Sequence, residues 1–193
     1  MLVNFGGAQL SCSDSNLSSL VIFLRGCPYR CFYCQNKEII DGNDERSMEE
    51  MNLLIQKSRG LISEVVLSGG EPMMQPGAIE YIAKFTKGLN LKLGIETSGY
   101  NSGKLLNLIK NKLINEVFLD IKTYGNENYH KLTGNDWAWD NVLNVIHICD
   151  NYKIPLELRT TVSQNYPTPK DLEKIELLAQ KHNLHWKKQE ALN

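Results

Sequence analysis

Three cysteines lie within eight residues of one short segment, residues 25–36. Cys27, Cys31 and Cys34 follow the spacing C-x₃-C-x₂-C. Thiolates that converge from a short loop are the usual ligands of iron–sulfur clusters. Four irons held by three cysteines leave one iron without a protein ligand, where a small molecule could bind and react. The spacing therefore predicts that these three cysteines bind a metal cluster and form the centre of the chemistry.

Other uses of the cysteines remain open but are less favoured. A structural zinc site would need Cys12 or a histidine as a fourth ligand, and zinc sites favour two separated cysteine pairs. An electron carrier of the four-cysteine type would need a second cysteine run, and a disulfide reading is weaker still. We do not assign Cys12 as a ligand. Cys149 lies on an apolar helical stripe, which predicts a core position.

The composition is that of an ordinary globular protein. The 193 residues are 42% hydrophobic and 22% charged, which predicts one domain over residues 1–193. A net charge of −1 gives no reason to expect nucleic acid or an anionic membrane as partner. No apolar run approaches the roughly 18 residues of a membrane-spanning helix, and no signal peptide is recognisable. Five cysteines, three of them clustered, indicate metal binding in a reducing cytoplasm.

Apolar runs alternate with helical patterns from Leu20 onward. Because parallel strands need such crossover connections, the pattern predicts an α/β fold with a parallel sheet. We predict a partial (β/α)₆ TIM-like barrel over residues 20–190, after an N-terminal extension, residues 1–19, that contains a short strand at 3–5. An open, doubly wound sheet is the alternative. The expected strands are 20–24, 64–68, 91–95, 117–119, 156–162 and 184–186, and residues 123–139 are expected to be irregular.

Polar side chains follow these expected strands at the points where they end. Since the carboxyl ends of parallel strands meet at one edge of the sheet, these residues should share one site. They are the three cysteines after the first strand, then Gly69, Gly70, Glu71, Glu96, Thr97, Asp120, Lys122, Arg159 and Thr161.

The predicted groups suit a zwitterionic amino acid that chelates the open iron. Glu71 and the carbonyls beside Gly69 and Gly70 could accept its ammonium protons, because glycines let backbone approach a ligand closely. Lys122 or Arg159 could bind its carboxylate. The remaining groups, Glu96, Thr97 and Asp120, could hold ribose hydroxyls or a small cation. Two structural readings stay open, a simple Gly-Gly turn and ion pairs Glu96–Arg159 and Asp120–Lys122.

The motif C-x₃-C-x-(aromatic)-C, with Tyr33 as the aromatic residue, resembles the cluster loop of radical S-adenosylmethionine (SAM) enzymes. The resemblance extends from Leu20 to Val162. It implies a partial barrel in which Cys27, Cys31 and Cys34 ligate a [4Fe–4S] cluster and SAM chelates the fourth iron. It further implies cofactor contacts: Tyr33 and Gln35 would flank the adenine, Gly70 and Glu71 would receive the methionine amine, and Asp120, Lys122 and Arg159 would line the nucleoside and carboxylate.

Within that superfamily, four segments resemble activating enzymes of glycyl radical proteins. They are VIFLRGCPYRCFYCQN at 21–36, SGGEP at 68–72, ETSG at 96–99 and LDIK at 119–122. The similarity is greatest to anaerobic ribonucleoside-triphosphate reductase activating proteins, then to pyruvate formate-lyase activators. It implies an oxidoreductase that cleaves SAM reductively to a 5′-deoxyadenosyl radical, which takes hydrogen from a glycine of the partner enzyme. A flavodoxin- or ferredoxin-like protein would supply the electron.

Two departures bear on the partner rather than on the superfamily. Gln35 stands where a histidine often follows the third cysteine, and Ser13–Asn16 replaces the usual Asp-Tyr-Pro-Gly. A small-molecule radical SAM enzyme such as 7-carboxy-7-deazaguanine synthase therefore stays open, as does a passive iron–sulfur electron carrier. His182 and His185 are expected at the surface. The aromatic segment 124–139 is either a partner-contacting surface or ordinary loop packing.

Overall fold

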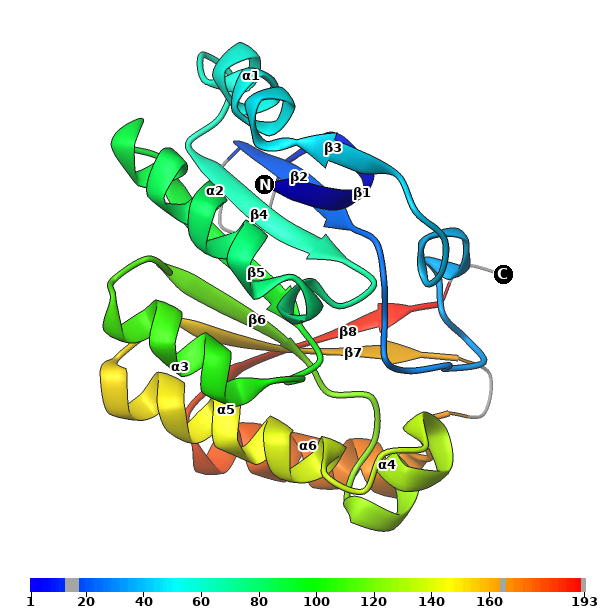
Figure 1. The fold of residues 1–193 in the computed structure, drawn as a ribbon. Helices are drawn as coiled ribbons and strands as arrows, with labels where there is room; N and C mark the ends of the chain where they lie inside the picture. Colours follow the sequence, from blue (N-terminus) through cyan, green and yellow to red (C-terminus); the bar gives the residue numbers. More distant parts are fainter. Residues whose placement is uncertain (13–17, 164–165, 192–193) are drawn as a thin grey trace.

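A computed structural model describes residues 1–12, 18–163 and 166–191 of the chain. Its sheet has the strand order β3-β1-β2-β4-β5-β6-β7-β8 (Figure 1). From β2 to β8 every neighbouring pair is parallel, which confirms the predicted parallel sheet. The parallel strands are β2 (Ser18–Leu24), β4 (Glu64–Gly69), β5 (Lys92–Thr97), β6 (Glu116–Asp120), β7 (Leu156–Val162) and β8 (His185–Glu190).

The N-terminal region is more regular than the sequence predicts. Instead of a short strand at 3–5, β1 spans Leu2–Cys12 and pairs antiparallel with β2. A short strand, β3 (Glu45–Ser47), pairs with β1 over Leu2–Asn4. The glycine- and serine-rich sequence of β1 carries no alternation, so its extent depends on pairing with the buried strand β2. The Cys12 side chain and the departure at Ser13–Asn16 lie outside the described residues.

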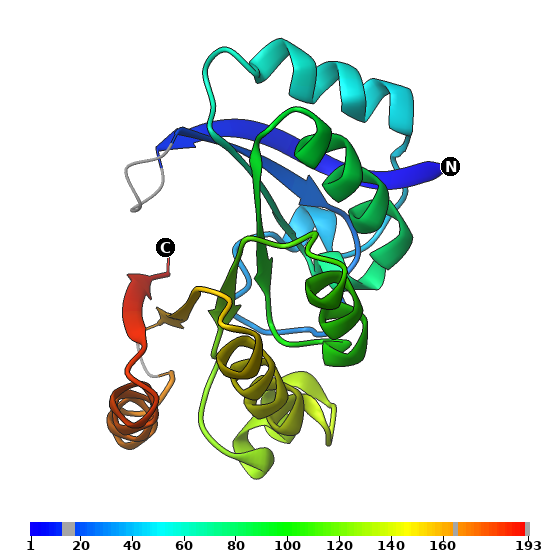
Figure 2. The ribbon, with the colours of Figure 1, turned by 90° about the vertical axis from the view of Figure 1, so that its left-hand side faces the viewer.

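Helices cover the outer face of the curved sheet (Figures 1 and 2). Capping boxes begin two of them as the sequence indicates, at Ser47 with Glu50 and at Thr168 with Asp171. The segment expected to be irregular contains a helix, α4. The helices are α1 (Met48–Ser58), α2 (Pro76–Gly88), α3 (Ser102–Lys110), α4 (Asn126–Thr133), α5 (Ala138–Tyr152) and α6 (Pro169–Lys181), with 3₁₀ turns η1 (Lys37–Ile39) and η2 (Pro72–Met74).

The main core lies between these helices and one face of the sheet. Alternate strand residues such as Ile22, Leu67 and Leu119 are fully buried there, and Cys149 is buried among them as predicted. In the aromatic segment 124–139, the Trp139 ring lies 5.5 Å from the buried Tyr129 ring, whereas Trp137 is 70% exposed. The opposite face of the sheet is left free of helices and lines a cavity. Among the described residues, no helix has the length and apolarity to cross a bilayer.

Candidate active site

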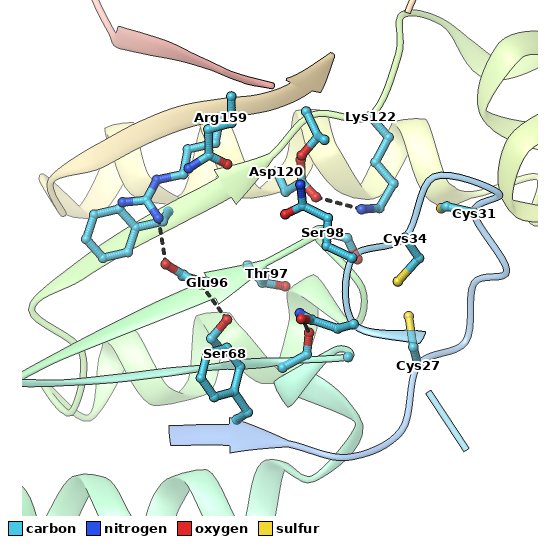
Figure 3. A pocket seen from close by; sticks show the side chains of 18 of the residues that line it. Cys27, Cys31, Cys34, Ser68, Glu96, Thr97, Ser98, Asp120, Lys122 and Arg159 are labelled. Atoms are coloured by element: carbon cyan, nitrogen blue, oxygen red, sulfur yellow. Dashed lines mark hydrogen bonds and ion pairs between the residues drawn. The ribbon is translucent and has the colours of Figure 1, made fainter. Parts of the chain in front are cut away.

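A cavity of about 530 Å³ lies at the carboxyl ends of the parallel strands. Figure 3 shows its two ends, the cysteines on one side and Arg159 on the other. Almost all of the predicted site residues line this one cavity, although they come from five separate segments of the chain. They are Cys27, Cys31, Tyr33, Cys34, Gln35, Gly69, Gly70, Glu96, Thr97, Asp120, Lys122, Arg159 and Thr161.

The cysteine loop leaves the end of β2 and folds back on itself. The backbone N–H of Cys34 donates to the carbonyl of Cys31 at 3.1 Å, and Arg30 donates to the carbonyl of Cys27 at 2.6 Å. The sulfur atoms of Cys27 and Cys34 point toward one another (Figure 3). Burial raises the pKa of Cys27, and it raises the pKa of Cys31 to about 11. Metal-free thiols at these two positions are therefore protonated at neutral pH.

The donor set fits a multi-iron cluster better than a single metal ion. In the described parts of the chain, no three cysteine, histidine or acidic side chains stand close enough to hold one ion. A tetrahedral zinc ion needs four ligands at one point. Three soft thiols around one end of a cavity suit a larger cluster with an open iron.

The Gly-Gly turn after β4 lies directly against the start of the cysteine loop. The N–H of Gly70 donates to the Leu24 carbonyl at 3.0 Å, and that of Glu71 donates to the Gly26 carbonyl at 2.8 Å. A Cβ on Gly69 would overlap the backbone of Leu24, and one on Gly70 would overlap that of Gly26. The two glycines are therefore required by the contact between two backbone segments, in addition to any approach of a ligand.

The Glu71 side chain lies outside the lining of the cavity. It is buried behind the floor, where it accepts four hydrogen bonds from Met73, Thr97 and Ser98. Its oxygens already have four donors within the protein, and the predicted contact with a ligand's ammonium group stays a prediction. The sequence places Glu71 beside the two glycines but does not reveal which way the side chain turns.

Lys122 and Asp120 form a shielded ion pair near the cysteines. Lys122 Nζ lies 2.6 Å from Asp120 Oδ2, and the lysine side chain is 13% exposed. Burial alone would lower the pKa of Lys122, but Asp120, together with Tyr33 and Cys31, outweighs this, and the pKa is raised well above its usual value. Lys122 is therefore a fixed positive charge that a ligand carboxylate could share with Asp120.

Arg159 holds the opposite end of the cavity. Its guanidinium lies 2.5 Å from Glu96 Oε1 and 2.6 Å from Glu157 Oε1. It also stacks over the Phe118 ring, 4.1 Å from the centroid. The second Glu96 oxygen accepts a hydrogen bond from Ser68 (Figure 3). Both ion pairs that the sequence left open are thus present, and both face the cavity.

The sequence matches the radical SAM superfamily over residues 21–181. The chain belongs to that superfamily. A putative glycyl-radical enzyme activating enzyme of Methanocaldococcus jannaschii is 30% identical over 162 residues, which cover 82% of this chain and 67% of that one. The pyruvate formate-lyase-activating enzyme of Clostridium pasteurianum is 27% identical over 194 residues, which cover 90% and 79%.

The fold is also similar to that of solved structures. The crystal structure of Streptococcus suis SuiB bound to precursor peptide SuiA superposes with a TM-score of 0.73 at 13% identity. The match covers 89% of this chain and 39% of SuiB, so this chain corresponds to less than half of that protein. The curved parallel sheet described above is thus consistent with the partial TIM-like barrel of this superfamily.

Membership of the superfamily implies a [4Fe–4S] cluster and SAM, and the cavity suits both. Its thiol end provides three soft ligands, and its remaining walls provide hydroxyl, carboxylate and ammonium groups. Gln35 lines the cavity, and its amide donates to the Glu190 carbonyl at 3.4 Å and so links the loop to β8, while its contact with the adenine stays a prediction. Tyr33 lines the cavity with its hydroxyl 3.5 Å from the Lys122 carbonyl.

Several lining residues escaped the sequence analysis. Ser68 and Phe118 lie on the same face of neighbouring strands as Glu96 and Asp120, and strand alternation could have found them. Asn36 was visible in the cysteine loop, and its amide donates to the Gly69 carbonyl at 2.9 Å. No signal pointed to β1 or to the inward face of β8. The residues missed are Gln9, Ser11, Val21, Phe23, Tyr29, Asn36, Ser68, Ser98, Phe118 and Gln189.

Proposed function

We propose that this radical SAM protein activates a glycyl radical enzyme, with anaerobic ribonucleoside-triphosphate reductase as the partner. The proposal rests on the cavity, which has three thiols at one end and whose two cationic side chains, Lys122 and Arg159, are already paired with carboxylates. The two relatives described above, both activating enzymes by name, support the reaction class. A pyruvate formate-lyase type of partner is the second candidate, which the 27% identical relative favours.

The cavity residues divide between the two cofactors. Cys27, Cys31 and Cys34 would hold the [4Fe–4S] cluster, which supplies one-electron cleavage of the SAM sulfonium bond. Lys122 would share the SAM carboxylate with Asp120, since its charge is fixed and shielded. Glu96 and Thr97, from the end of β5, would face the ribose hydroxyls. The ammonium acceptors would be backbone carbonyls of the Gly-Gly turn and the Asp120 carboxylate rather than Glu71.

The paired charges favour a polypeptide substrate over a nucleotide. The cavity's positive side chains within the described residues are Lys122 and Arg159, and each has a carboxylate partner. A triphosphate would leave several negative charges without a counter-cation at a buried site, which is costly. A neutral peptide segment has no such requirement. This distinguishes the proposed activase from radical SAM enzymes that act on phosphorylated small molecules.

Anaerobic reconstitution tests the proposal. With iron, sulfide, dithionite and SAM, the protein should release 5′-deoxyadenosine and methionine. Mixed with purified anaerobic ribonucleoside-triphosphate reductase of the same organism, it should produce the glycyl doublet in electron paramagnetic resonance. In the reducing cytoplasm, a flavodoxin- or ferredoxin-like donor would replace dithionite. SAM cleavage without a doublet from this reductase or from a pyruvate formate-lyase would rule out the activase proposal.

A further inference from the structure

Strand β1 has an uncovered edge. Its outer edge pairs with β3 only over Leu2–Asn4, and beyond that, in the described residues, its strand partner is β2 alone. The stretch Gly6–Ser11 therefore presents every second backbone N–H and C=O away from the sheet. Ala8, Gln9 and Leu10 are all exposed, and Leu10 is 57% exposed.

Beyond the irregularity between Phe5 and Gly7, this edge lacks the features that normally prevent strand addition. Natural edge strands carry lysines, prolines, inward charges or bulges that discourage pairing with another chain. The sequence Gly6–Ser11, Gly-Gly-Ala-Gln-Leu-Ser, has no charge and no proline, and its one irregularity lies at the Phe5–Gly7 end. The opposite edge of the sheet, β8, carries Lys187, Lys188 and Glu190, so it is protected in the usual way.

The uncovered edge borders the active-site cavity. The side chains of Gln9 and Ser11 line the cavity from β1, and Gln189 lines it from β8. These side chains are amides and hydroxyls, which suit the hydrogen-bonding groups of a polypeptide. The end of β8 is already linked to the cysteine loop, because the Gln35 amide donates to the Glu190 carbonyl. β1 is the side that remains available.

One end of β1 lies next to the cysteine loop. Because β1 runs antiparallel to β2, its Phe5 end pairs with Leu24, directly before the cysteine loop, and its Ser11 end pairs with Ser19. A strand added along Gly6–Ser11 would therefore run between the open side of the barrel and its cluster end. Main-chain pairing also suits a reaction at a glycine Cα, where the backbone itself must approach the cofactor.

We propose that the free edge of β1, Gly6–Ser11, binds an extended segment of the polypeptide substrate by strand addition, next to the glycine that reacts. The inference rests on the proposed function and adds the mode of substrate recognition. Affinity comes from main-chain hydrogen bonds, and Gln9, Ser11 and Gln189 contact the segment from the cavity side. A second copy of this chain is the competing occupant, and the test separates the two.

The first measurement is amide hydrogen exchange on the reconstituted protein. The probe is a synthetic peptide of about twelve residues that spans the radical glycine of the anaerobic ribonucleoside-triphosphate reductase from the same organism. In excess, it should slow exchange of the Gly6–Ser11 amides at least tenfold and leave the β8 amides unchanged. This readout does not require turnover, so it is independent of SAM cleavage.

The second measurement uses a charged edge. The double variant Ala8→Lys/Leu10→Lys places lysines at two exposed positions that do not line the cavity. Release of 5′-deoxyadenosine without partner should stay within twofold of wild type, whereas the glycyl radical yield should fall at least tenfold. The matched control is Leu177→Lys on α6, where the side chain is 59% exposed. It should leave both readouts unchanged.

The outcomes separate the inference from the proposed function. Normal radical yield in the double variant, together with unprotected β1 amides, overturns strand addition while the activase stands. A wild-type dimer that the double variant converts to monomer, without peptide protection, assigns the edge to a second copy and also overturns it. Absence of SAM cleavage in wild type overturns the proposed function, and β1 protection by the peptide would still support the binding site.

Discussion

The Glu71 carboxylate lies in direct contact with Ser98. Glu71 Oε2 accepts hydrogen bonds from the Ser98 N–H at 2.8 Å and from the Ser98 hydroxyl at 2.6 Å. Oε1 accepts from Thr97 at 2.8 Å and from the Met73 N–H at 3.0 Å. These bonds join the turn after β4 to the end of β5, below the cavity floor. Burial raises the pKa of Glu71, and the four donors partly offset that rise.

Replacing Glu71 should therefore destabilise the protein rather than only weaken SAM binding. In Glu71→Gln an amide NH₂ would face N–H and O–H donors, which leaves buried groups unpaired at a cost of about 1–3 kcal/mol. For a chain of this length, each kcal/mol corresponds to about 2–4 °C in Tm. Thermal unfolding of the metal-free protein measures the change. The variant Glu80→Gln, at a half-exposed position that pairs with Lys84, is the control and should change stability by less than about 0.5 kcal/mol. Equal melting of the two variants would contradict the structural role of Glu71.

Gly70 has no room for a side chain. A Cβ there would overlap the Gly26 backbone and press against Cys27 Cβ, so Gly70→Ala must push the Gly-Gly turn and the cysteine loop apart. Overpacking of this kind costs about 1–3 kcal/mol. We expect the variant to lose stability and to retain less iron after reconstitution. Gly77→Ala is the matched control, because nothing lies near its Cβ in helix α2. Iron content of Gly70→Ala equal to that control would show that the turn tolerates a methyl group.

The parallel sheet was predictable because most of its strands contain apolar runs that are visible in the sequence. Residues 64–68 and 117–119 are such runs, and each lies within a strand of the structure. The extent of β1 was not predictable, since Gly6 and Gly7 interrupt any alternation and the strand depends on β2 for its register. Helix α4 was missed for a related reason. Its sequence, Asn-Glu-Asn-Tyr-His-Lys-Leu-Thr, buries only Tyr129 and shows no apolar stripe.

The site followed from topology more than from any single motif. Polar residues at strand ends had to meet, and Glu96, Asp120 and Arg159 do line one cavity. The direction of side chains in the turns could not be predicted from the sequence pattern. Gly69 and Gly70 line the cavity, whereas the side chain of the next residue, Glu71, is buried outside the cavity lining. Gln189 was not predicted because the strand expected at 184–186 ends before it, whereas β8 continues to Glu190.

The cysteines of the loop should differ sharply from the core cysteine. Cys31→Ala removes one of the three proposed ligands, so iron and acid-labile sulfide after anaerobic reconstitution should fall to background. Cys149→Ala removes a thiol that is 1% exposed in the helix core, and it should retain the cluster while losing of order 1 kcal/mol of stability. Iron retention in Cys31→Ala equal to that of Cys149→Ala would exclude Cys31 as a ligand.

A pair of carboxyl groups lies on the inner face of the barrel away from the cysteines. Glu64 is fully buried, and neither of its carboxylate oxygens has a hydrogen-bond partner. Gly94 lies on β5, between the strands that carry Glu64 and Glu116, and its lack of a side chain lets these two side chains approach each other. A Cβ at Gly94 would lie 3.1 Å from Glu64 Oε1 and 3.4 Å from Glu116 Cγ. Burial, together with the Glu116 carboxyl, raises the pKa of Glu64 to about 8, although Lys92 and Arg159 oppose the rise.

This raised pKa predicts how stability depends on pH. Between about pH 4.5 and pH 8 the folded protein keeps a proton on Glu64 that the unfolded chain releases, so stability falls as pH rises through that window. Glu64→Gln cannot ionise and lacks this loss. It should match wild type near pH 5 and be more stable by about 1–3 kcal/mol at pH 9. Urea unfolding at the two pH values measures the difference, with the exposed Glu49→Gln as control. A Glu64→Gln variant that gains no stability at pH 9 would show that Glu64 ionises as freely in the folded protein as in the unfolded chain.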